Sequence, residues 1–309
     1  MKLIKINISC CRNDLYFLRI CVASIRYWNT TVPVYLLKDF SKGDFDTAEL
    51  EKVFNVGVVD TKYRNLQAYI KLQPFIENNN ERIFLQDADV VWLGDIIEEL
   101  KDYTEDIVIH SYKPADLEKE INKRYFKMER MTKFYPYNYP GFVFNTGAML
   151  FNTTILDSKD FDGIIRWQEN ALPLHDNVFL CEDQGILNFL IGNKILDKKI
   201  SYASKDLQLW GFAKEVDQYD IAQIMEKKGI TKVIHWYGEK PGFTSLMPGR
   251  HILDFYEKHY YSQLERGSLK LVAERFRRTF PRIGMYVYEG IKKLYYRLNS
   301  RKQYEHTPR

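Results

Sequence analysis

Apolar runs and helical stripes alternate along the first hundred residues of the chain. The runs lack a strict apolar–polar alternation, which is typical of strands that are covered on both faces. The predicted strands are residues 3–9, 32–37, 56–60 and 82–93. The predicted helices are residues 14–28, 45–54 and 65–76, the last interrupted at Pro74. Strands that alternate with helices in this way indicate an α/β fold with a mostly parallel, Rossmann-like central sheet flanked by helices.

The second half of the chain has a weaker pattern. Residues 142–152 predict a strand with a glycine break, and residues 232–238 predict a strand that runs into a turn. Residues 183–192 and 250–262 have helical spacing. No repeat, low-complexity tract or Gly/Ser linker divides these elements. We therefore expect residues 1–265 to form one α/β domain.

The C-terminal end of the chain is more basic than the rest. The chain carries a net charge of +4, and residues 266–309 contain 12 Lys and Arg against 3 acids. Apolar residues interleaved with these cations predict a basic, aromatic-rich helical appendage, which suits the surface of an anionic membrane. A helix docked on the body, or a dimer contact, is the alternative. Nucleic acid is not an expected partner, because no known nucleic-acid-binding module accompanies the charge.

Length and composition allow a large packed core, since the chain has 309 residues of which 45% are apolar. The four cysteines form no C-x-x-C pair, which indicates free thiols in a reducing compartment. The N-terminus lacks the apolar region of a signal peptide, and no run reaches about 18 apolar residues. We expect a cytoplasmic protein, peripheral at the inner face of the membrane.

Two carboxylates interrupt the apolar run "RIFLQDADVVWL". Asp87 and Asp89 point to the same side if the strand is still extended, and a bend at the strand end could also bring them together. Buried carboxylates need a cation, and Mg²⁺ or Mn²⁺ commonly bridges carboxylates to the phosphates of a substrate. In doubly wound sheets, ligands bind at the carboxyl ends of the strands. The alternative is a pair of surface acids at a strand–loop junction.

A second candidate is the segment "IHWYGEKPG". It places His235 at a strand end, followed by Gly238 and Lys240 in a turn. Histidine is a common ligand for Mn²⁺-like ions, glycine lets backbone N–H groups approach a phosphate, and lysine supplies a charge. A core histidine before an ordinary turn is the other interpretation.

Six segments, taken in order, resemble the glycosyltransferases of family 8, which have the GT-A fold and include bacterial lipopolysaccharide glycosyltransferases. The resemblance covers roughly residues 3–245. The segments are "NDLYFLRICVASI" (13–25), "AYIKLQPFI" (68–76), "FLQDADVV" (84–91), "FNTGAMLFN" (144–152), "CEDQGILN" (181–188) and "HWYGEKPG" (235–242). Four features depart from the pattern: Lys71 replaces an arginine, Gly185 replaces an aspartate, Cys10 and Cys11 stand in a turn that often carries alanine and aspartate, and the last motif is one residue shorter before Lys240 and ends without its tryptophan.

The resemblance implies a metal-dependent hexosyltransferase that uses a nucleotide sugar, with UDP-hexose as the expected donor. Asp87, Asp89 and His235 are then the ligands of Mn²⁺ or Mg²⁺. The acceptor is a glycan or a lipid-linked saccharide, and the anomeric configuration is retained. The remaining residues expected to bind the donor nucleotide and its phosphates are Cys10, Tyr16, Lys71, Ala88, Gly238 and Lys240.

The same resemblance assigns three residues to the donor sugar and the reaction. Asn145 bonds the sugar, Asp183 holds sugar hydroxyls, and Gln184 lies near the anomeric carbon. From the residues alone, Asp183 could instead cap the helix that follows it, and Asn145 could bond a neighbouring backbone group.

Two other functions fit part of the sequence. A nucleotidyltransferase also uses paired acids and Mg²⁺, but the usual glycine-rich loop after the first strand is missing from "SCCRNDLY". A catalytically silent, membrane-docked module that binds nucleotide sugars is the alternative from another class. Retention of Asp89 and His235 favours the enzyme.

Overall fold

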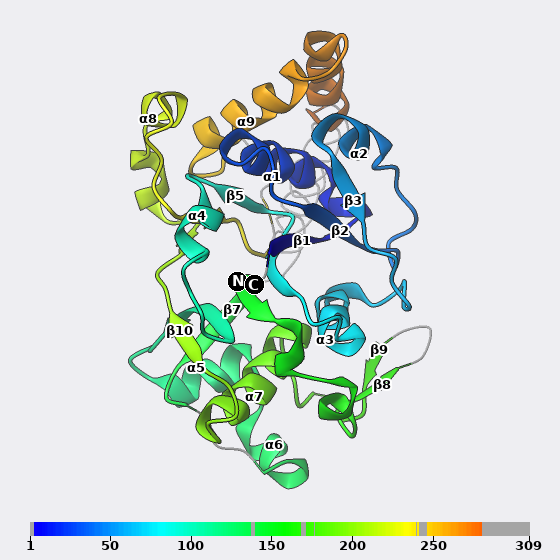
Figure 1. Cartoon of the computed structure of the whole chain (residues 1–309), viewed down its shortest axis with the longest axis vertical. Coiled ribbons are helices and arrows are strands. Elements are labelled where there is room, and N and C mark those ends of the chain that lie inside the picture. The colour runs from blue at the N-terminus through cyan, green and yellow to red at the C-terminus, as the bar shows by residue number, and fades with distance from the viewer. Residues whose placement is uncertain are drawn as a thin grey trace, which may run out of the picture.

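The computed structural model of the chain describes residues 3–136, 140–167, 171–175, 177–238, 240 and 246–279. Within this part, the central element is a seven-stranded sheet in the order β10-β6-β7-β4-β1-β2-β3 (Figure 1). Its strands are β1 (Ile4–Cys11), β2 (Val34–Asp39), β3 (Val56–Val58), β4 (Arg82–Asp87), β6 (Ile107–Tyr112), β7 (Val143–Asn152) and β10 (Tyr202–Ser204). β1, β2, β3 and β4 pair in parallel, and β7 runs antiparallel to β4 and β6. The predicted, mostly parallel sheet is confirmed.

Two small sheets accompany the central one. The first has the order β11-β12-β5 and consists of β5 (Val90–Trp92), β11 (Gln208–Trp210) and β12 (Val233–His235). The second is the pair β8 (Ile165–Trp167) and β9 (Ala171–Pro173). The single strand predicted over residues 82–93 is therefore wrong. The chain turns after Asp87, so that β4 stays in the central sheet while β5 pairs with β12.

The helices confirm most of the predicted pattern. They are α1 (Leu15–Trp28), α2 (Ala48–Phe54), α3 (Gln73–Glu77), α4 (Ile96–Leu100), α5 (Leu117–Arg124), α6 (Met128–Phe134), α7 (Glu182–Leu196), α8 (Ile221–Met225) and α9 (Arg250–Ser262). Short 3₁₀ helices are η1 (Arg12–Asp14), η2 (Gln67–Leu72), η3 (Thr153–Ile155), η4 (Ser158–Phe161) and η5 (Lys214–Gln218). The sequence predicted that Pro74 interrupts a helix. In the structure Pro74 instead lies in the first turn of α3, where the N–H that proline lacks would have no partner within the helix.

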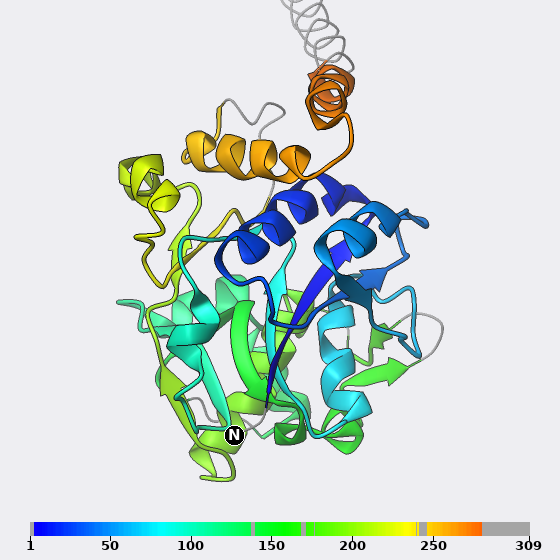
Figure 2. The ribbon, with the colours of Figure 1, turned by 45° about the horizontal axis from the view of Figure 1, so that its top comes forward.

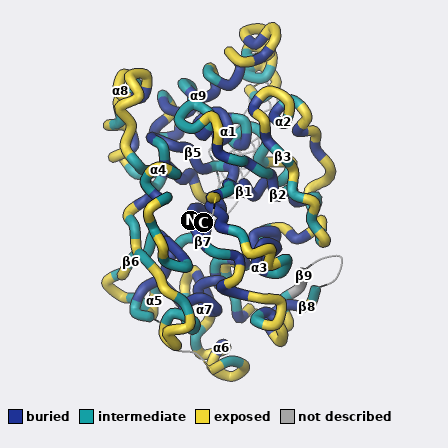
Figure 3. Tube along the Cα trace, in the orientation of Figure 1, coloured by how far each residue is buried: buried dark blue, intermediate teal, exposed yellow. Residues whose placement is uncertain are grey.

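Helices cover both faces of the central sheet, so its inner strands are largely buried, whereas the edge strands β3 and β10 are partly exposed. Successive residues of β4 show this: Ile83 and Leu85 pack into one apolar cluster and Phe84 into the other. α1, α2 and α9 lie on one side in Figure 1, and α3, α5, α6 and α7 lie on the other. Buried positions follow the strands in Figure 3, while α8 and the tip of α6 are largely exposed.

The C-terminal elements extend this layer of helices. α9 lies across α1 (Figure 2). At this contact the indole N–H of Trp28 donates to the hydroxyl of Tyr256 at 2.8 Å. A further helix, residues 267–279, follows α9. It begins the predicted basic appendage, whose remaining residues, 280–309, lie outside the described part of the chain. None of the described helices combines the length and the apolar content that crossing a membrane requires.

Candidate metal and nucleotide-sugar site

The two carboxylates converge at a turn. Asp87 is the last residue of β4, and Ala88 and Asp89 form the turn before β5. The N–H of Ala88 donates to the backbone carbonyl of Ser9 at 3.1 Å, and the Ser9 hydroxyl donates to Asp87 Oδ1 at 2.7 Å. Of the two geometries that the spacing allowed, the bend is the correct one.

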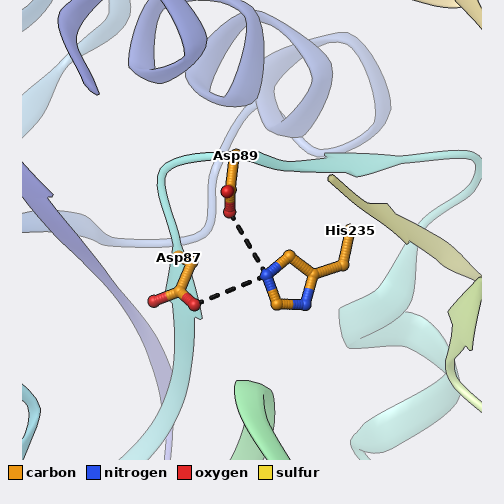
Figure 4. Close-up of side chains that lie close together, drawn as sticks. All are labelled: Asp87, Asp89 and His235. Atoms are coloured by element: carbon orange, nitrogen blue, oxygen red, sulfur yellow. Dashed lines mark ion pairs between the residues drawn. The ribbon is translucent and has the colours of Figure 1, made fainter. Parts of the chain in front are cut away.

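His235 reaches the same point through the small sheet. β12 runs antiparallel to β5 with His235 opposite Val90, so the imidazole lies directly beside the turn. The Nε2 atom of His235 is 3.5 Å from Asp87 Oδ2 and 3.3 Å from Asp89 Oδ1 (Figure 4). One ligand atom from each residue lies within 4.8 Å of the other two, a spacing at which all three could contact a single ion. The predicted metal ligands are thus brought together.

The environment of Asp89 supports a cation at this point. Its Oδ1 atom is buried and accepts no hydrogen bond among the described residues, while Lys240 pairs with Oδ2. Burial alone would raise the pKa of Asp89, but His235 and Lys240 outweigh it and hold the pKa well below its usual range. A buried carboxylate oxygen that accepts no hydrogen bond among the described residues is a fitting ligand for Mn²⁺ or Mg²⁺, and an imidazole nitrogen beside it favours Mn²⁺.

Lys71 connects this cluster to the next part of the site. It lies in η2, and its side chain is only 9% exposed. Its Nζ is 2.7 Å from Asp87 Oδ1 and 3.3 Å from Asp183 Oδ2. Burial alone would lower the pKa of Lys71, but the two carboxylates raise it above its usual value, so the lysine is a fixed cation.

The three residues expected at the donor sugar come from β7 and α7. Asp183 Oδ2 accepts from the Thr146 hydroxyl at 2.7 Å, and Asn145 Nδ2 donates to Gln184 Oε1 at 2.7 Å. Burial raises the pKa of Asp183, and Lys71 offsets part of this effect. The capping interpretation of Asp183 is wrong, because α7 starts at Glu182 after Cys181. Asn145 does make the alternative backbone contact, since its Oδ1 accepts from the N–H of Gly147 at 2.8 Å.

A smaller cavity of about 300 Å³ opens on one side of the turn. Its walls come from β1, β2, η2 and the turn itself, and Cys10, Lys71 and Ala88 are among the lining residues. Cys10 is buried, its Sγ is 3.8 Å from the carbonyl oxygen of Leu37, and burial raises the pKa of its thiol. Tyr16 does not line this cavity; its ring packs against Phe17 and lies under the guanidinium of Arg278.

A larger cavity of about 860 Å³ opens on the other side. It contains the predicted residues of β7, α7 and β12, together with Gly238, which has a left-handed φ of 75°. Lys240 lies nearby through its pairing with Asp89. Other lining residues were not singled out from the sequence, because all but Tyr237, which lies in "HWYGEKPG", come from segments that match no motif. They are mainly His110, Tyr112, Glu120, Arg124, Trp210 and Tyr237.

Comparison with known proteins identifies the architecture. No protein-family model matches the sequence. No curated protein matches it either. The structure is similar to the bifunctional glycosyltransferase WbbM, with a TM-score of 0.56 and 15% identity over 84% of this chain and 50% of that one. It is also similar to the glycosyltransferase GlyE of Streptococcus pneumoniae TIGR4, with a TM-score of 0.51 and 14% identity over 90% of this chain and 64% of that one.

The chain therefore spans about half the length of WbbM and somewhat less than two thirds of GlyE. At these identities the likeness concerns the fold alone. The mostly parallel sheet flanked by helices, with an Asp-x-Asp turn at the end of β4, is the GT-A fold of glycosyltransferases.

Proposed function

We propose that the protein is a metal-dependent, retaining glycosyltransferase of the family 8 type, which transfers a hexose from a UDP-sugar to a saccharide. The observation that carries this proposal is the cluster of Asp87, Asp89 and His235 at the junction of the two cavities, with a buried oxygen of Asp89 that accepts no hydrogen bond among the described residues. A nucleotide in the smaller cavity and a sugar in the larger one would meet at this cluster.

The cluster and its lysines suit a diphosphate leaving group. Asp87, Asp89 and His235 would hold Mn²⁺ or Mg²⁺, which supplies Lewis-acid stabilisation of the leaving diphosphate. Lys240 lies beside Asp89, and Lys71 lies between Asp87 and Asp183, so both can donate to oxygens that gain charge as the glycosidic bond breaks. Gly238 would add a backbone N–H to the phosphates, as would Ala88. Cys10 would line the base pocket, and Tyr16 would support it from α1.

The donor sugar would lie against β7 and α7. Asp183 is held by Thr146 and Lys71, and this fixed carboxylate would accept from sugar hydroxyls. Asn145 holds the side-chain amide of Gln184, which would lie near the anomeric carbon. An amide is a poor nucleophile, so we infer front-face substitution with retention. Analysis of the product anomer by NMR tests this step, and an inverted anomer would contradict it.

Release of UDP from a panel of UDP-sugars tests the proposal as a whole. We expect slow hydrolysis of one donor with Mn²⁺, abolished by EDTA and by Asp89→Ala. Turnover of a nucleoside triphosphate in place of a UDP-sugar would favour a nucleotidyltransferase. Binding of the UDP-sugar without any turnover, with or without a saccharide, would favour a silent module.

The larger cavity also suits the acceptor, because its aromatic wall, formed by Trp210 and Tyr237, can stack a sugar ring. Trp210 and Tyr237 pack edge to face with centroids 5.2 Å apart, and Arg124 pairs with Glu120 at 2.8 Å beside them. We expect Trp210→Ala to lower transfer to glycans or lipid-linked saccharides and to leave hydrolysis of the donor unchanged. Equal loss of both activities would contradict a role for this wall in acceptor binding.

An anionic membrane surface is the proposed location of a lipid-linked acceptor. In the helix of residues 267–279, Leu269, Val272 and Phe276 are each at least 64% exposed and lie at helical spacing. Cosedimentation with vesicles tests this location. We expect binding to vesicles with anionic lipid and loss of binding after Phe276→Glu. Binding that is unchanged by the substitution would contradict the role of this helix.

A further inference from the structure

The imidazole of His235 is held from behind by residues that the sequence did not single out. Its side chain is 4% exposed, and its Nε2 faces the two carboxylates. Its other ring nitrogen, Nδ1, is 3.4 Å from Oε1 of Gln208. An amide oxygen only accepts, so this contact requires that Nδ1 carries a proton.

The orientation of the Gln208 amide is itself fixed. Gln208 is 3% exposed, and its Nε2 donates to the backbone carbonyl of Ala148 at 3.2 Å. A reversed amide would place an oxygen against that carbonyl and an N–H₂ group against Nδ1. The buried carbonyl of Ala148 therefore selects the rotamer in which Oε1 faces the imidazole.

Gly147 supplies the space for the ring. A methyl group at this position would lie 2.2 Å from Cε1 and 2.6 Å from Nδ1 of His235. No side chain other than hydrogen fits there while the imidazole keeps its place. The glycine break in the strand predicted over residues 142–152 thus has a steric reason.

We propose that Gln208 and Gly147 form a cradle that fixes the position of His235 and a proton on its Nδ1, so that Nε2 is the nitrogen that faces Asp87 and Asp89. Gln208 is a positioning residue: it does not face the ligand cluster but determines which nitrogen of the imidazole is free to bind. Histidine ligands generally donate their second N–H to such a partner, and the loss of that partner weakens metal binding about 10- to 100-fold. The inference rests on the proposed metal site, but its first consequence, a proton on Nδ1, needs no metal.

The test uses the full chain labelled with ¹⁵N-histidine. We expect long-range ¹H–¹⁵N spectra to show a protonated Nδ1 on His235, both without metal and with diamagnetic Mg²⁺. Gln208→Leu should remove this state, and Gln208→Glu should restore it, since a carboxylate also accepts from Nδ1–H. A wild-type His235 with an unprotonated Nδ1, or a spectrum unchanged by Gln208→Leu, would overturn the proposal.

Mn²⁺ affinity, measured by electron paramagnetic resonance, gives the second readout. We expect about 10- to 100-fold weaker binding in Gln208→Leu, recovery in Gln208→Glu, and weaker binding in Gly147→Ala. The matched control is Thr153→Val, which also removes a buried hydrogen-bonding group but lies near the start of β4, remote from Asp87. Equal affinity in Gln208→Leu and wild type would refute the cradle and leave the proposed function standing. Absence of Mn²⁺ binding in all variants, with Nδ1 protonated, would instead refute the metal site.

Discussion

The two cavities that meet at Asp89 are built from the chain in different ways. The smaller one is lined by the carboxyl ends of β1, β2 and β4, by residues that follow these strands, and by η2. The larger one combines β6, α5, β7, α7, β11 and β12, which come from distant parts of the sequence. The carboxyl ends of parallel strands meet at one edge of a sheet, so the order of elements alone predicts the first cavity. The second depends on an antiparallel strand and an additional small sheet, which that order does not reveal.

The largest effect is expected at Lys71, which lies between the two cavities. Lys71→Met keeps the apolar stem but removes the cation that neutralises Asp87 and Asp183. Breaking a buried pair in this way costs about 3–5 kcal/mol, because the remaining charge stays buried. Urea unfolding measures the loss, and UDP release should fall with it.

Lys5→Met is the control for Lys71→Met. Lys5 pairs with Glu81, but both side chains are about 30% exposed. An exposed pair of this kind contributes at most about 1 kcal/mol. Equal losses in the two variants would show that Lys71 has no special place in the site.

A smaller effect is expected inside the larger cavity. Thr146→Val removes the hydroxyl that donates to Asp183 at 2.7 Å and leaves a buried carboxylate with one partner fewer. We expect the free energy of unfolding to fall by about 1–3 kcal/mol, and donor hydrolysis to fall as well. Thr146→Ser retains the hydroxyl and should behave like wild type. If Thr146→Ser lost as much activity as Thr146→Val, packing of the methyl group would explain the effect better than the hydrogen bond.

The smaller cavity offers the corresponding variant, Asp39→Ala. Asp39 is buried and accepts the N–H of Gln67 at 2.7 Å and the N–H of Ser41 at 3.3 Å, which holds the two sides of the cavity together. We expect about tenfold weaker binding of UDP, equivalent to about 1.4 kcal/mol, and unchanged affinity for Mn²⁺ alone. Calorimetry measures both. A parallel loss of Mn²⁺ affinity would mean that the substitution also disturbs the metal ligands, and that its effect is not confined to the smaller cavity.

The smallest effect is expected far from both cavities, at Glu49. It accepts from the hydroxyl of Tyr260 at 2.7 Å and pairs with Lys270 at 2.6 Å. Burial alone would raise the pKa of Glu49, but Lys270 and Tyr260 lower it below its usual value of 4.5. A lowered pKa in the folded state adds stability above about pH 4.5, and this stability disappears as the pH falls through the folded-state value.

Glu49→Gln should therefore lower the free energy of unfolding at pH 7 by less than about 1 kcal/mol, and the melting temperature should fall slightly with it. Thermal melts of the two proteins should converge as the pH falls below 4.5. A difference that grows toward acid pH would have the wrong sign for this mechanism.

The sequence predicted the parts of the molecule that rest on local pattern and chain order. Most strands and helices of the first hundred residues follow from apolar periodicity, and the convergence of Asp87 and Asp89 follows from their spacing. The approach of His235 was expected from the resemblance to family 8. The division of residues 82–93 into β4 and β5 could not be predicted, because both halves are equally apolar and only the pairing of β5 with β12 separates them.

Residues without a motif were missed. Gln208 lies in a three-residue strand that matches no motif. Its positioning role depends on its contacts with His235 and Ala148, which only the structure shows. Trp210 is an aromatic residue among many. Tyr16 was assigned to the nucleotide through the resemblance of residues 13–25 to family 8, and this assignment stays a prediction: its ring lies beside Phe17 and Arg278, outside the lining of the smaller cavity.

The central claim is that Asp87, Asp89 and His235 hold a divalent cation at the junction of the two cavities. Its most direct test is titration of the metal-free full chain with Mn²⁺ in the presence of UDP, followed by electron paramagnetic resonance, for wild type and Asp89→Asn. We predict one Mn²⁺ per wild-type chain and at least about tenfold weaker binding in the variant, because one charged ligand is lost. Equal binding by both proteins, or no binding by either, would contradict the claim.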